Sequence, residues 1–204
     1  MRKLLVLFLF TLLSSTFVGC GAAMLVGDLV RSGKKDIKVV VPPTTSLSML
    51  KDVKILGLSL NGIDNKGQYV FAMGQGNTNA TVYSDMLSME LLRAGLKSKS
   101  ISENISDNTP KEKLDELLKN NINVVLTGNL TISTTTSSTA GWTGGDWASS
   151  GITNFTLKGI DTKDGSILFM VSAEYGKAKD AGEVTKDIAE IYQDILAGNI
   201  EKYK

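Results

Sequence analysis

The stretch INVVLTGNLTI, residues Ile122–Ile132, decides the fold class. It is rich in Val, Leu, Ile and Thr, which predicts a β-strand. Two further strands are predicted at Ile152–Ile160 and Ser166–Ala173, and the turn between them contains Asp164-Gly165, a pair typical of hairpins. The second half of the chain therefore predicts three consecutive strands.

A capping sequence directly before this stretch predicts a helix. Thr109 suits the N-cap, Pro110 suits the first helical position, and Glu112 completes a capping box. The predicted buried face of this helix consists of Leu114, Leu117 and Leu118.

Apolar residues at helical spacing predict two more helices. The first is Ala80–Leu96, which ends at Gly95. Its predicted buried stripe is Val82, Met86, Met89 and Leu92, widened by Leu87 and Leu91. The last helix begins at the capping pair Asp180 and Glu183. Its predicted buried face is Val184, Ile188, Ile191 and Ile195.

Two short strands are predicted near the start of the domain. Ile37–Val41 is β-branched and is ended by Pro42-Pro43, and Val53–Leu60 alternates in polarity. With a short strand between the first two helices, the order becomes β-β-α-β-α-β-β-β-α. This order predicts a single α/β (α+β) domain in which about three helices pack on a mixed sheet.

The N-terminus has the pattern of an export signal. Arg2 and Lys3 precede the apolar run Leu4–Leu13, which is shorter than the about 20 residues that a spanning helix needs. Phe17-Val18-Gly19-Cys20 then resembles the lipobox read by the lipoprotein signal peptidase. We therefore expect cleavage before Cys20 and acyl chains, such as palmitate, on its thiol. A plain secretory peptide or an uncleaved N-terminal anchor is the alternative.

This pattern divides the chain into three predicted parts. They are a signal peptide at residues 1–19, a lipidated tether at residues 20–36 and a domain at residues 37–204. Gly21 stands where an Asp would resemble an inner-membrane retention signal. Its presence favours the outer membrane, with the domain facing the periplasm.

The composition argues against an enzyme. The chain has no histidine and its single cysteine is Cys20, so the lipidated protein has neither imidazole nor free thiol for catalysis. We expect no cofactor and no metal, since zinc ligands are scarce and no Asp-rich calcium loop appears. Removing Arg2 and Lys3 leaves 20 of the 22 basic residues against 21 acidic ones, which gives no basic face for nucleic acid.

The segment Ser133–Ser150 is predicted to be a loop between two strands, low in charge and rich in Ser, Thr and Gly. It contains Trp142 and Trp147 together with Gly144 and Gly145. Exposed indoles are typical of membrane interfaces and of partner-binding surfaces, so this is a candidate membrane or partner loop. The alternative is an ordinary hairpin loop whose indoles pack on their own strands.

Several short motifs follow one another in order between the predicted tether and the last strands. They are Pro42-Pro43, Leu50–Leu60, Asn61–Tyr69, Asn123–Gly128 and Ile160–Leu168. As a set they resemble the CsgG-like lipoproteins, the family of the curli secretion channel and of HfaB-type proteins. Related domains occur in penicillin-binding-protein activator lipoproteins and in the N-terminal domain of TolB-like proteins. The resemblance implies an α/β sheet covered by helices.

The resemblance also implies a second candidate site. Tyr69, Phe71 and Asn77 lie in a segment similar to the channel's constriction loop, and a solvated connection is the alternative. Asn129–Ile160 resembles the first of the channel's two membrane hairpins, but Glu174–Lys179 leaves no room for the second. A closed barrel of the same design is therefore not expected.

Together these features predict a non-enzymatic, lipid-anchored protein of outer-membrane secretion or assembly, such as curli assembly. It would act through contacts with other envelope proteins or with copies of itself, and its domain would be held at the membrane by the lipid anchor. A periplasmic activator of a peptidoglycan synthase is the alternative.

Overall fold

A six-stranded mixed sheet forms the centre of the structure, a computed structural model that describes residues 35–43, 45, 47–64, 66, 81–138 and 146–203. In spatial order the strands are β1 (Lys35–Val40), β6 (Ile167–Lys179), β5 (Asp146–Asp161), β4 (Ile122–Ser138), β2 (Ile55–Ile63) and β3 (Ser98–Ser100). Pairing is antiparallel from β1 to β4, and β4, β2 and β3 run parallel. All of these strands lie in the unit Lys35–Lys204.

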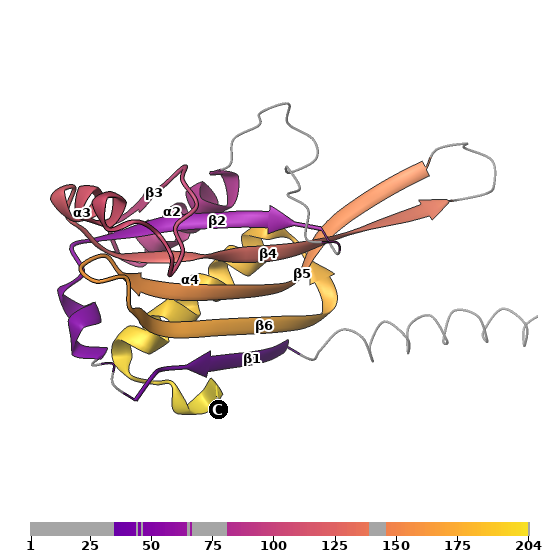
Figure 1. Cartoon of the computed structure of the whole chain (residues 1–204). Helices are drawn as coiled ribbons and strands as arrows, with labels where there is room; N and C mark the ends of the chain where they lie inside the picture. Colours follow the sequence, from indigo (N-terminus) through magenta and orange to yellow (C-terminus); the bar gives the residue numbers. More distant parts are fainter. Residues whose placement is uncertain are drawn as a thin grey trace, which may run out of the picture. The chain divides into compact units, whose positions relative to one another are not determined.

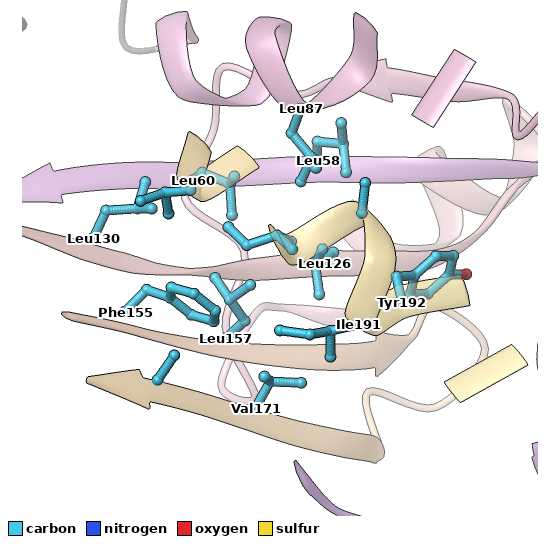
Figure 2. Close-up of a cluster of buried hydrophobic side chains, with 14 of the residues drawn as sticks. Leu58, Leu60, Leu87, Leu126, Leu130, Phe155, Leu157, Val171, Ile191 and Tyr192 are labelled. Carbon is cyan, nitrogen blue, oxygen red and sulfur yellow. The ribbon is translucent and has the colours of Figure 1, made fainter. Parts of the chain in front are cut away.

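Helices cover the two faces of the sheet unequally. The helices are α2 (Val82–Arg93), α3 (Lys111–Lys119) and α4 (Ala181–Ala197), with short 3-10 turns η1 (Leu47–Asp52) and η2 (Glu201–Tyr203). Leu126 of β4 packs in the main core with Leu87 of α2 and Ile191 of α4 (Figure 2). The neighbouring Val125 points to the other face, where it joins a small core with Leu114 of α3. Thus α2 and α4 cover one face, and α3 covers part of the other.

The predicted order of elements is confirmed, including the short strand between α2 and α3. The best-predicted element is α4, because its cap and its apolar stripe agree. The carboxylate of Asp180 accepts a hydrogen bond from the Glu183 backbone N–H at 2.8 Å. The four residues predicted for its buried face are all buried: Val184, Ile188, Ile191 and Ile195.

The predicted buried stripe of α2 is wrong in phase. Met89 and Leu92 are 58% and 68% exposed, whereas Leu87 and Leu91, predicted only to widen the stripe, are wholly buried. The reason is Ser84, whose hydroxyl accepts a hydrogen bond from the Leu60 backbone N–H at 2.9 Å. A polar residue therefore occupies the centre of the buried face, and an apolar pattern cannot reveal it.

The start of α3 also differs from the prediction. Pro110 is the N-cap, and no side chain caps the helix. The Thr109 hydroxyl instead accepts a hydrogen bond from the Ser106 backbone N–H at 2.8 Å, within the preceding turn. Of the three predicted buried leucines, Leu114 is buried, Leu117 is partly buried against the same small core, and Leu118 is 37% exposed. The helix therefore packs through Leu114 and, in part, Leu117.

Alanine substitutions in α3 should show which of these leucines stabilises the domain. Leu114→Ala should lower the free energy of unfolding by about 2–5 kcal/mol, because Leu114 is 4% exposed in the smaller core. Leu118→Ala should change it by less than about 1 kcal/mol, since that residue is 37% exposed and belongs to neither core. Denaturant unfolding of both variants measures the difference. Equal losses would contradict this packing of α3.

Candidate functional site: a hairpin arm

Strands β4 and β5 continue past all their neighbours (Figure 1). The pairing of β2 with β4 ends at Ile63–Thr131, and that of β6 with β5 ends at Lys179–Ile152. Beyond these points, Ser133–Ser138 pairs only with Asp146–Gly151 among the described strands. We call these two segments the arm. It is a two-stranded ribbon that projects from the end of the sheet.

An irregularity in the pairing marks the base of the arm. Thr131 pairs with Asn154 and the next residue, Ile132, pairs with Ile152, so Thr153 is one extra residue in β5. Such a bulge bends a strand and increases its local twist. The Thr153 hydroxyl donates to the Thr131 carbonyl at 3.3 Å across the bulge. The bulge accounts for the arm leaving the direction of the sheet.

The structure corrects the prediction of a loop at Ser133–Ser150. The backbone is strand from Ser133 to Ser138 and again from Asp146 onward. Polar residues without alternating apolar ones predict a loop, which is why the sequence pattern does not reveal these strands. The signal for a strand was the run Thr134–Thr136, because β-branched threonine favours extended backbone even without an apolar face.

The predicted site residues have different outcomes. The backbone of Trp147 lies in β5, opposite Ser137 of β4. The other residues of the predicted tryptophan loop, Trp142, Gly144 and Gly145, lie outside the described residues. So do Tyr69, Phe71 and Asn77 of the predicted constriction-like loop, and the lipidation residue Cys20.

The outer edges of the arm lack the usual protection against pairing with another strand. Exposed edges are normally blunted by charges, by proline or by short length. Edge strand β1 carries Lys35, Asp36 and Lys38, and edge strand β3 has only three residues. Residues 133–151 contain no proline and one charged residue, Asp146. The arm can therefore accept a partner strand through main-chain hydrogen bonds.

The first described strand starts at the same end of the sheet as the arm. Lys35 of β1 pairs with Tyr175 of β6, and the adjacent Glu174 pairs with Asn154, two residues from the end of the β5–β6 pairing. Chain that precedes β1 therefore joins the domain beside the base of the arm.

A carboxylate on α4 fastens this end of β1. Asp187 forms an ion pair with Lys35 at 2.8 Å, accepts from the Tyr175 hydroxyl at 3.0 Å and contacts Lys179 at 3.3 Å. Its side chain is only 13% exposed. Burial acts to raise the pKa of Asp187, but the hydrogen bond and charge of Lys35 hold that pKa below its ordinary value. Burial and the charge of Asp187 raise the pKa of Tyr175.

One expectation about the surroundings of the arm can be compared with the structure. Strand β6 continues to Lys179 and α4 begins at Ala181, so no second hairpin lies between them, as predicted. Among the described residues no three acidic or cysteine side chains gather as a metal ion would require. No described helix has the length and hydropathy of a membrane span.

Comparison with known proteins gives no family for this chain. No family model and no curated protein matches it. Among solved structures, the PelC dodecamer from Paraburkholderia phytofirmans is similar over 80% of this chain and 97% of its own, with 11% identity and a TM-score of 0.46. The LpoB C-terminal domain from Salmonella enterica covers 63% of this chain and 92% of its own, with 15% identity and a TM-score of 0.26. The resemblance to the CsgG-like family stays a prediction from sequence motifs.

Proposed function

We propose that the chain is a lipid-anchored, non-enzymatic protein of the cell envelope that acts through protein contacts made by the arm. The observation that carries the proposal is the projection of β4 and β5 beyond the sheet, where each of them pairs only with the other among the described strands. The arm adds no described residue to either core. Its length and its unprotected edges suit contact with another chain.

The proposed anchor fits this use of the arm. With a signal peptide at residues 1–19 and acyl chains on Cys20, the fourteen residues Gly21–Lys34 connect the membrane to β1. They span at most about 50 Å when extended. The six-residue strands of the arm project about 20 Å from the same end of the sheet. The tip of the arm is therefore within reach of the membrane surface or of a partner beside it.

The finer role that we propose is outer-membrane secretion or assembly of the CsgG-like type, with the domain of residues 37–204 in the periplasm. The sequence motifs between Pro42 and Leu168 support it. An arm with two open edges can meet two neighbours at once, which favours a homo-oligomer over an activator that works as a monomer. Sizing of the purified protein in detergent separates the two roles.

Replacement of the proposed lipidated residue tests the anchor. Cys20→Ala should leave an uncleaved precursor or a soluble periplasmic form, because no thiol remains to accept acyl chains. Metabolic labelling with a clickable fatty acid should mark the wild-type protein and leave the variant unmarked. Labelling of the variant would refute the anchor.

Replacement of the two tryptophans tests the arm's tip. The double variant Trp142→Ala, Trp147→Ala should stay folded but weaken assembly or membrane attachment, because indoles contribute several kcal/mol at contact surfaces (about 2–4). Thermal unfolding reports on the fold, and sizing in detergent reports on assembly. A collapse of stability with normal assembly of the folded fraction would show that the tryptophans stabilise the domain instead.

A further inference from the structure

Strand β1 is held to the sheet by few interactions. It pairs on one side only, with β6, and Val39 is its one buried residue. Ile37 and Val41 are partly buried, and Val40 is 59% exposed. In contrast, β4 pairs on both sides and buries Val124, Leu126 and Leu130. Among the described strands of six residues or more, β1 should therefore be the first to open.

Asp187, Lys35, Tyr175 and Lys179, which we call the Asp187 cluster, lie at the N-terminal end of β1. In a protein anchored through Cys20, tension on the chain reaches the domain at Lys35, because the preceding segment leads to Cys20. Tension at the end of an antiparallel strand separates its pairs one after another, beginning with Lys35–Tyr175. Asp187 binds both members of this first pair and adds Lys179. The ion pair between Lys35 and Asp187 thus joins β1 to α4 at the first strand pair to break.

We propose that Asp187 acts as a latch: its contacts hold β1 to β6. When these contacts break, β1 detaches from the sheet and lengthens the tether between the membrane and the domain. Release would add the twelve residues Lys35–Ser46 to the chain between Cys20 and the next fixed element, η1, which begins at Leu47. The maximum reach would grow from about 50 Å to about 90 Å. The domain could then bind a partner farther from its membrane. The use of this length rests on the proposed lipid anchor, whereas the opening of β1 does not.

Hydrogen exchange with mass spectrometry on the full chain in detergent tests the latch. The variants are Asp187→Asn, which removes the charge, and Lys35→Gln, which removes only the partner on the edge strand. Asp85→Asn is the matched control. Asp85 lies on α2 and accepts hydrogen bonds from the hydroxyls of Thr81 and of Ser100 in edge strand β3, which is at the opposite edge of the sheet from β1.

Peptides from β1 should exchange faster than peptides from residues 122–132 in the wild-type protein. Both latch variants should speed exchange in β1 by about tenfold or more without changing residues 122–132, and Asp85→Asn should leave β1 unchanged. If Asp187→Asn fails to fold, Lys35→Gln decides. Equal exchange of β1 and β4 in the wild type, or no effect of Lys35→Gln, would overturn the latch. The Cys20→Ala chain should give the same pattern, so failure of the anchor and failure of the latch are distinguishable.

Discussion

Gly128→Ala is expected to prevent the domain from folding. A Cβ at this position would lie 2.0 Å from the Thr156 carbonyl oxygen and 2.8 Å from the Leu157 Cα, both backbone atoms of the paired strand β5. These atoms are fixed by the β4–β5 ladder and cannot move aside without breaking it. We expect a loss above about 4 kcal/mol, which is a large part of the about 5–15 kcal/mol by which a typical domain is stable. Far-UV circular dichroism and denaturant unfolding measure it.

Substitutions at two other glycines give stability losses with which the loss at Gly128 can be compared. Gly95→Ala should cost only about 1 kcal/mol, because its φ of +79° is unfavourable for alanine but nothing lies within 4 Å of the added methyl group. Gly159→Ala should cost at least about 3 kcal/mol, since the methyl group would lie 2.3 Å from a carbon of the Phe169 ring, which is wholly buried. A Gly128→Ala variant as stable as Gly95→Ala would contradict the register of β4 and β5.

The order of elements was predictable because local signals agree with the tertiary structure at most places. The stripe of α4 matches its cap, and the Asp161–Ser166 turn closes with Gly165 at a φ of +76°. Only glycine adopts that conformation without strain, so the sequence marks the turn. The ends of such elements can be predicted from the local sequence.

Other features depend on contacts far apart in the chain. Ser84 can be buried because its hydroxyl accepts a hydrogen bond from the backbone N–H of Leu60 in β2. The Asp187 cluster joins β1 to α4 across about 150 residues of chain, and no local pattern indicates it. The strand pattern ends at Ile132 because the polar run Ser133–Ser138 has no alternating apolar residues, and only the resemblance of Asn129–Ile160 to a channel hairpin indicates paired strands there. The candidate partner loop itself stays a prediction, and the structure shows only that strands flank it.

Removal of the arm should abolish assembly and leave the fold intact. Ile132 and Ile152 face each other at its base, so Asn-Gly can replace residues 133–151 as a two-residue hairpin turn. The shortened protein loses no described residue of either core, so its unfolding midpoint should stay close to that of the wild type. A matched variant replaces only residues 139–145 with Asn-Gly. It keeps both strands of the arm and tests the tip alone.

The most direct measurement is the mass of the full chain in detergent, by light scattering after size exclusion, with and without the arm. Chemical cross-linking in intact cells shows whether the same species exist in the envelope. We predict that the wild-type protein forms an oligomer and that the shortened protein is a folded monomer without cross-linked partners. A shortened protein that keeps the wild-type mass and cross-links would contradict the claim that this protein acts through its arm.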